Sequence, residues 1–157
     1  SIILEDKAPY ILKKYTIDIA EGGEKSITCR LEFPSSDKIK YNFIGIYDGD
    51  MRERLDTSKL NWKWLFLPGN KALEELFREY LHVPENIEKF CEVVGKEKQQ
   101  IITMLATIDG NYHDWFEELR KFLGIDGKML VRNFYRIMRE MDKEIEEFIT
   151  ELKKNIG

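Results

Sequence analysis

The stretch FIGIYDGDMRE, residues 43–53, contains the clearest strand signal in this 157-residue chain. The run that ends at Tyr47 is nearly all apolar, which is typical of a strand that helices bury on both faces. It stops abruptly at Asp48 and Asp50, with only Gly49 between them. Ligands of an open α/β sheet bind outside the carboxyl ends of its strands, so this position favours a functional site. Asp and Gly are also favoured turn residues, and a simple turn is the alternative.

The pattern around this strand predicts an α/β fold with an open, mainly parallel sheet flanked by helices. Strands are expected over residues 2–4, 16–20, 42–47 and 64–67, and helices over residues 7–15 and 26–33. Alternating strands and helices are typical of parallel sheets with right-handed crossover connections. An apolar strand pattern begins directly after Ser1. That abrupt start suggests a piece of a longer polypeptide.

The rest of the chain is expected to be all helical. Capping signals and apolar spacing predict helices over residues 70–81, with Asn70 as the cap, and over residues 84–95, 96–108 and 112–123. The apolar residues between Leu130 and Leu152 recur at intervals of three and four, which predicts one amphipathic helix of roughly seven turns. The chain is thus expected to form a sheet domain over residues 1–82 and a helical extension over residues 83–157. The extension packs on that domain or on a partner, such as a second subunit.

Composition and charge limit the classes of function. No apolar stretch approaches the roughly 20 residues that cross a bilayer, and the start of the chain has no signal-peptide pattern. Cys29 and Cys91 form no CxxC pair, so we expect a reduced, cytoplasmic setting without a membrane. The net charge of −4 weakly disfavours general nucleic-acid binding, but residues 38–71 carry seven basic and four acidic side chains. That window surrounds the two aspartates and can attract a phosphate-bearing ligand.

Three carboxylates are expected at one edge of the predicted sheet. Side chains two positions apart on an extended chain point the same way, so Asp48 and Asp50 can face one site. Glu5 follows the first predicted strand and therefore reaches the same edge. Three acids in one place repel one another unless a cation lies among them, and carboxylates with waters are usual Mg²⁺ ligands. The sequence predicts a divalent metal site, although each acid taken alone is equally explained as a turn or surface residue.

These motifs resemble the Toprim domain and, within it, the OLD (overcoming lysogenization defect) nucleases. Toprim domains carry a glutamate after the first strand and Asp-x-Asp after a later one, which IILE at Glu5 and YDGD at Asp48 and Asp50 match. Three further stretches look similar to the OLD branch: AEGGEK at 20–25, LFLPGNKALEEL at 65–76 and HDWFEEL at 113–119. The resemblance covers roughly residues 1–82, and the rest of the chain only loosely. It departs from the family at Asp6, where glycine is usual, and at Pro9, where a further acid is often found.

The resemblance implies an endonuclease that hydrolyses phosphodiester bonds in DNA with two Mg²⁺ or Mn²⁺ ions. Glu5, Asp48 and Asp50 would hold the metal, with Glu74 as a further ligand. It also implies an upstream ATPase domain or subunit in a DNA defence or repair protein. No GxxxxGK[ST] phosphate-binding motif occurs in this chain.

Basic residues beside the aspartates have predicted roles in the same reaction. Lys59 would offset charge on the phosphate, with Lys63 as an alternative, and Arg52, Arg54 and Lys63 would contact the DNA backbone. For each of them a solvated surface position is the competing explanation. Trp62 and Trp64 are better explained by core packing than by base stacking.

Two other classes of function stay open on the sequence. A Toprim-like scaffold that has lost catalysis and serves assembly or partner binding is one, and the Pro9 departure favours it. The other is a phosphatase of the haloacid dehalogenase type, which also places Asp-x-Asp after a buried strand. His82 and His113 have no Cys or His partners at zinc spacing, so a structural zinc site is not expected.

Overall fold

The computed structural model describes residues 2–34 and 43–156 and divides the chain into two compact units. The first unit contains Ile3–Lys71 and Lys143–Gly157, and the second contains Ala72–Asp142 together with Ile2. The sequence suggested one division near residue 82. In the structure the division falls after Lys71, and the last helix belongs with the sheet.

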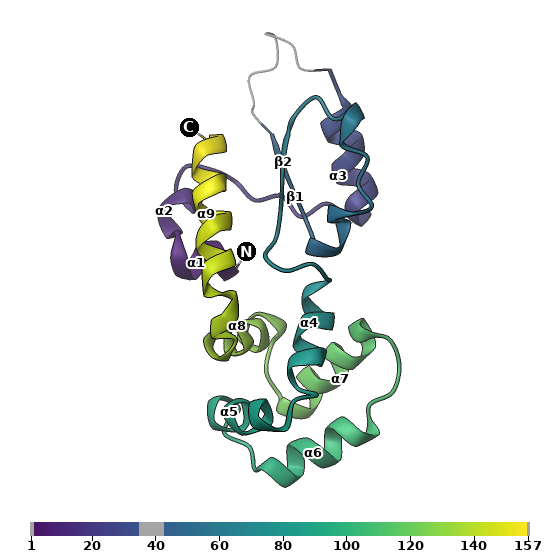
Figure 1. The fold of residues 1–157 in the computed structure, drawn as a ribbon, viewed down its shortest axis with the longest axis vertical. Helices are drawn as coiled ribbons and strands as arrows, with labels where there is room; N and C mark the ends of the chain where they lie inside the picture. Colours follow the sequence, from purple (N-terminus) through teal and green to yellow (C-terminus); the bar gives the residue numbers. More distant parts are fainter. Residues whose placement is uncertain (1, 35–42, 157) are drawn as a thin grey trace. The chain divides into compact units, whose positions relative to one another are not determined.

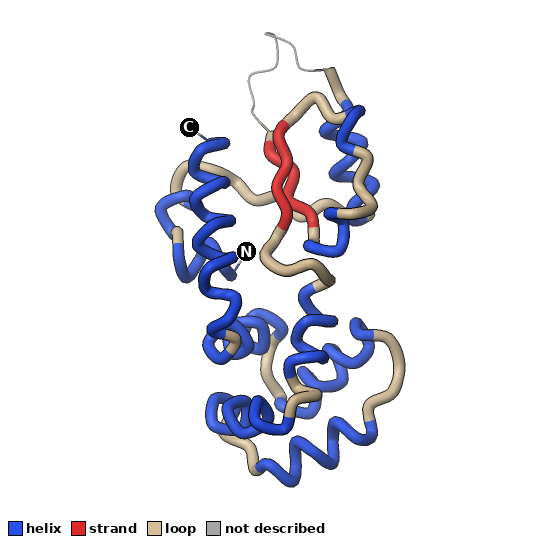
Figure 2. Tube along the Cα trace, in the orientation of Figure 1, coloured by secondary structure: helices blue, strands red, loops and turns tan. Residues whose placement is uncertain are grey.

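A parallel pair of strands is the centre of the first unit. Strand β1 (Ile44–Tyr47) pairs with β2 (Lys63–Phe66), so that Ile44 lies opposite Lys63 and Tyr47 opposite Phe66 (Figures 1 and 2). Parallel strands need a crossover of about a dozen residues or more. Here residues 48–62 make it with two short 3₁₀ helices, η1 (Gly49–Arg52) and η2 (Thr57–Lys59). The strands predicted over residues 42–47 and 64–67 and their parallel pairing are confirmed, except at Asn42, which lies outside the described residues.

Helix α3 (Gly23–Glu32) packs against β1 and closes the core of the sheet. Gly45 permits the close approach, because a Cβ atom there would overlap with the side chain of Leu31. Leu31, Tyr47 and Met51 form the buried cluster, and Trp62 and Trp64 are among the partly buried side chains packed on it. The core role expected for the two tryptophans is therefore confirmed.

The N-terminal residues form two short helices, the first of which lies where a strand was predicted. Residues 2–4 belong to α1 (Ile2–Lys7), and the helix expected over residues 7–15 is the shorter α2 (Pro9–Leu12). Leu4, Ala8 and Ile11 are buried at intervals of four and three, so helical periodicity prevails over the short apolar run.

The second predicted strand is also absent. Residues 16–20 have no regular structure, and the Ile19 side chain is 85% exposed, which shows that the alternating pattern is not used in a sheet. The described part of the chain is thus mixed α/β, but its sheet has two strands instead of the expected four.

The predicted long C-terminal helix is divided. It forms α8 (Gly127–Ile137), a 3₁₀ turn η3 (Arg139–Met141) and α9 (Asp142–Ile156). The break lies at Met138, whose backbone leaves the helical region with φ −83° and ψ 65°. Met138 and Met141 remain buried across the break, so the apolar spacing continues although the helix does not.

Helix α9 completes the first unit. Its buried face consists of Ile145, Phe148, Ile149 and Leu152. Near its end, the backbone carbonyl of Ile156 accepts a hydrogen bond from the Tyr15 hydroxyl at 2.8 Å, and Lys153 lies over the ring of Tyr10. Side chains from the two ends of the chain therefore meet within one unit.

The second unit is built from helices around an aromatic core. Its helices before α8 are α4 (Leu73–Tyr80), α5 (Pro84–Val94), α6 (Lys98–Thr107) and α7 (Tyr112–Leu123). The ring of Phe134 stacks on Phe77 at 4.1 Å and on Phe90 at 5.0 Å. The helices expected over residues 70–81, 84–95, 96–108 and 112–123 are confirmed. Helix α4 begins after Ala72, however, and not at Asn70. In the part of the chain that the structure describes, no helix has the length and apolarity of a membrane span.

The buried Tyr47 predicts an alkaline loss of stability. Burial raises the pKa of the Tyr47 phenol above its ordinary value near 10, the Thr28 hydrogen bond lowers it, and the Glu32 charge raises it further. The stabilising contribution is complete below the unfolded pKa and is lost as the pH rises through the higher folded pKa. We expect the free energy of unfolding to fall above about pH 10, and to fall less steeply in Tyr47→Phe.

Urea unfolding in a Trp115→Phe background measures this effect, since the fluorescence then comes from Trp62 and Trp64 in the first unit. Tyr10→Phe is the control, because Tyr10 is 47% exposed. Equal alkaline slopes for the parent and Tyr47→Phe would contradict the prediction.

Candidate functional site

The two aspartates follow a β-strand, as the sequence predicts, but they differ from each other in backbone geometry. Asp48 directly follows β1, is exposed and has an extended backbone, whereas the half-buried Asp50 lies within η1. The carbonyl of Asp48 accepts a hydrogen bond from the Met51 N–H at 3.1 Å, which closes this turn. The extended geometry that would point both carboxylates the same way is therefore wrong for Asp50.

Gly49 brings the end of β1 against the loop that follows β2. A Cβ atom at Gly49 would overlap with the carbonyl oxygen of Gly69 and lie 2.7 Å from its carbonyl carbon. The N–H of Leu67 donates to the Tyr47 carbonyl at 2.8 Å and extends the strand pairing into this loop. Residues 67–70 therefore lie beside the aspartate segment, at the carboxyl ends of both strands.

Arg52 donates hydrogen bonds to this same loop. Its Nε donates to the Gly69 carbonyl at 3.2 Å and its Nη2 donates to the Leu67 carbonyl at 3.1 Å. The guanidinium carbon also lies 5.0 Å from the centre of the Phe66 ring. The side chain predicted to contact DNA thus binds two carbonyls of its own protein.

Arg54 forms an ion pair with Asp50. Its Nη1 donates to Asp50 Oδ2 at 2.8 Å, and the Arg54 side chain is 61% exposed. An ion pair this exposed is weak, so the guanidinium can leave it for another anion.

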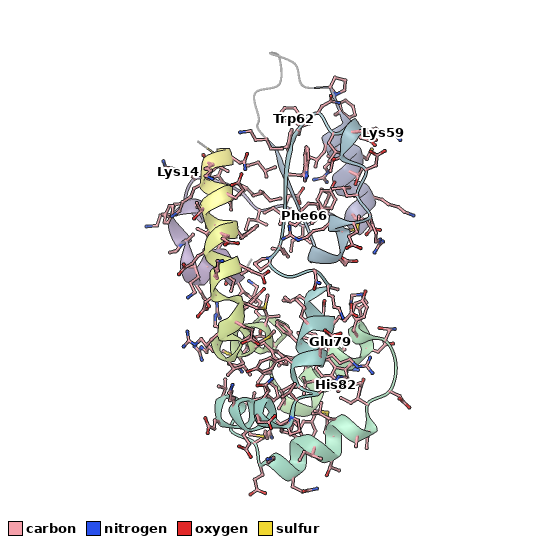
Figure 3. All side chains as sticks on the ribbon, viewed as in Figure 1. Lys14, Lys59, Trp62, Phe66, Glu79 and His82 are labelled. Carbon is pink, nitrogen blue, oxygen red and sulfur yellow. The ribbon has the colours of Figure 1, made fainter. Side chains whose placement is uncertain are left out.

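The two lysines with predicted roles lie elsewhere in the first unit. Lys59 lies at the end of η2 and pairs with Asp56 at 3.7 Å. It is beside the amino end of β2, whereas Phe66, at the carboxyl end of β2, lies opposite Tyr47, the residue before Asp48 (Figure 3). The Asp56 pKa is lowered, chiefly by its hydrogen bonds with the hydroxyl and N–H of Ser58 and then by Lys59. Lys63 Nζ donates to the Asn155 carbonyl at 3.3 Å. Of the predicted positive window, Lys38 and Lys40 lie outside the described residues.

The two predicted glutamate ligands lie on helices. Glu5 is half-buried within α1 and does not end a strand, so the geometric reason for placing it with the aspartates is wrong. Glu74 belongs to α4 in the second unit, where its Oε1 lies 3.8 Å from Nδ1 of His113. Over residues 2–34 and 43–156, no three His, Cys, Asp or Glu side chains are grouped as metal ligands. The structure does not bring Glu5, Asp48 and Asp50 into one cluster.

A further contact of the loop was not predicted. The N–H of Gly69 donates to Glu144 Oε2 on α9 at 2.7 Å. The two residues are 75 positions apart, and no local pattern in the sequence signals such a contact.

Comparisons with protein-family models, curated proteins and solved structures gave no match.

The backbone contact at Gly49 predicts a substitution that destabilises the first unit. Gly49→Ala places a methyl group against the Gly69 carbonyl, and backbone yields less readily than a side chain. We expect a loss of about 1–3 kcal/mol in unfolding free energy. Gly45→Ala is the comparison, because the three nearest atoms it meets all belong to the side chains of Leu31 and Ile27. Urea unfolding that found Gly45→Ala to be the costlier change would contradict this account.

Proposed function

We propose that this chain is a divalent-metal-dependent DNA endonuclease of the Toprim type, with Asp48 and Asp50 as its central metal ligands. The observation that carries the proposal is the position of this acidic pair, directly after β1 and beside the loop that follows the parallel strand β2. That is the edge at which α/β sheets bind ligands. The resemblance of YDGD and LPGNKALEEL to Toprim sequences supports the same assignment and adds a cytoplasmic, ATPase-coupled defence or repair protein as its setting.

The two carboxylates at this edge are oxygen donors of the kind that a hydrated divalent cation takes. Two carboxylates completed by waters are a usual environment for Mg²⁺, and Mn²⁺ accepts the same oxygen ligands. Asp50 Oδ2 already accepts from Arg54, so Asp50 would use its other oxygen. Bound there, the metal would supply an activated water and stabilise charge on the phosphate.

Residues of the chain would bind the metal ion and the phosphate groups of DNA. Asp48 and Asp50 would hold the cation, and Arg54, which is exposed and only weakly paired, would turn to a backbone phosphate of DNA. Arg52 is excluded from that role as long as it binds the carbonyls of Leu67 and Gly69. The roles of Glu5, Glu74, Lys59 and Lys63 remain predictions, and the described contacts of the two lysines are with Asp56 and with the Asn155 carbonyl.

A second candidate function is a scaffold that has lost catalysis. It is favoured by the helical position of Glu5 and by the lack of a three-ligand group among the residues described. Both candidates share the fold, so only metal binding and cleavage separate them.

Plasmid cleavage with Mg²⁺ or Mn²⁺, with an EDTA control, tests the nuclease. We expect Asp48→Asn and Asp50→Asn to lower the rate of cleavage by more than about 100-fold, because loss of a ligand affects the metal at least as strongly as loss of its supporting groups. Asp56→Asn is the matched control, since it makes the same charge change in the same crossover. Glu5→Gln reports whether that carboxylate belongs to the site.

Each outcome of this assay has a distinct meaning. Cleavage that persists in both site variants rejects Asp48 and Asp50 as ligands. If the parent chain does not cleave, calorimetry with Mn²⁺ decides between an inactive metal-binding protein and a scaffold without metal. A phosphorylated Asp48 would instead identify phosphatase chemistry.

The Arg54 ion pair predicts a change in metal affinity. Removing a cation from Asp50 favours a competing metal ion, and an exposed ion pair is worth at most roughly 1 kcal/mol. We therefore expect Arg54→Gln to tighten Mn²⁺ binding by up to about fivefold in calorimetry. Lys59→Gln makes the same charge change away from the pair and is the control. Weaker Mn²⁺ binding in Arg54→Gln would show that the guanidinium supports the site instead of competing for it.

A further inference from the structure

The peptide groups of Gly69 are held from two sides. Its carbonyl accepts from Arg52 Nε at 3.2 Å, and its N–H donates to Glu144 Oε2 at 2.7 Å. Arg52 also binds the Leu67 carbonyl, so one guanidinium spans two carbonyls of the loop. We call the set Arg52, Gly69 and Glu144 the Gly69 clamp. Both contacts involve a charged side chain and a backbone group, a pairing stronger than a neutral hydrogen bond.

The clamp fixes the loop against the aspartates. Gly69 contacts Gly49, the residue between Asp48 and Asp50, and no side chain separates the two backbones. Arg52 follows Asp50 by two residues in the same 3₁₀ turn. Its hydrogen bonds therefore join the segment that carries both carboxylates to the loop beside it.

Helix α9 supplies the other half of the clamp by lying along β2. Glu144, at the start of α9, binds Gly69 beyond the end of β2, and Asn155, near the end of α9, binds Lys63 at the start of β2. Eleven helical residues span about 17 Å and six extended residues about 20 Å, so the two contacts match in spacing. The helix and the strand therefore run in opposite directions (Figure 1).

We infer that Arg52 and Glu144 are positioning residues of the proposed metal site, and that α9 helps to set its geometry. The inference rests on the proposed function for the metal itself, but the clamp is a property of the protein alone. It assigns Arg52 a role different from DNA contact. It also makes the affinity of the site depend on a helix that contributes no proposed ligand.

The test combines two readouts on the full chain. Hydrogen exchange at the Gly69 amide, measured by NMR without metal, reports on the clamp, and calorimetry with Mn²⁺ reports on the site. We expect Arg52→Ala and Glu144→Ala to speed Gly69 exchange by about fivefold or more, the effect of losing one hydrogen bond of roughly 1 kcal/mol. We also expect both variants to weaken Mn²⁺ binding by a similar factor and to lower the midpoint of thermal unfolding by only about 2–4 °C.

Conservative variants and a matched control separate positioning from charge. Glu144→Gln keeps an oxygen that accepts from Gly69 but loses the charge, so both readouts should fall between those of the parent chain and those of Glu144→Ala. Arg52→Lys cannot span both carbonyls and should restore binding only in part. Glu146→Ala removes an exposed acid from the same helix and should change neither readout.

The possible failures are distinguishable. If the parent chain binds no Mn²⁺, the proposed function fails and with it the positioning role, while Gly69 exchange still shows whether the clamp exists. Unchanged exchange in both alanine variants overturns the clamp. Faster exchange with unchanged Mn²⁺ affinity overturns its role at the site, as does a Glu144→Gln variant that binds Mn²⁺ as weakly as Glu144→Ala.

Discussion

The parallel pairing of β1 with β2 is the constraint on which the first unit depends. Strands that run in the same direction cannot be joined by a tight hairpin, so the chain must return to the starting edge through residues 48–62. The short 3₁₀ turns of this crossover place Met51 in the core and leave Asp48 exposed. The topology therefore places the two aspartates that follow β1 at the edge of the sheet where β2 also ends.

Close backbone contact gives that edge its shape. Gly45 lets α3 approach β1, and Gly49 lets the loop after β2 approach the crossover. Both contacts depend on a missing side chain, and neither adds a polar group to the site. Hydrogen bonds from Arg52 and to Glu144 then secure the loop that such packing allows. The second unit follows a different principle, because its stacked phenylalanines bury apolar surface without any comparable backbone contact.

The sequence predicted the elements whose local signals agree with their environment. The apolar run before Asp48 predicted β1, and Pro84 and Gly95 bounded α5. Errors arose where a short apolar run fits two periods. Ile3 and Leu4 are buried in a helix, and Ile17 and Ile19 alternate without a strand to pair with in the described sheet. The position of the aspartates at a strand end was likewise predictable, but the contacts of Arg52 with Leu67 and Gly69 were not, because they depend on where the chain returns after β2.

The first unit is discontinuous in sequence, since Ala72–Asp142 lie between its two parts. A chain that emerges from the ribosome from its N-terminus therefore completes the helical unit before α9 is available to the sheet. Domains generally fold as units during synthesis, so the aromatic core can close first while β2 still lacks its helical neighbour. The contacts of Glu144 and Asn155 form only afterwards. The edge that carries Asp48 and Asp50 can thus be completed only after the inserted helices have been synthesised.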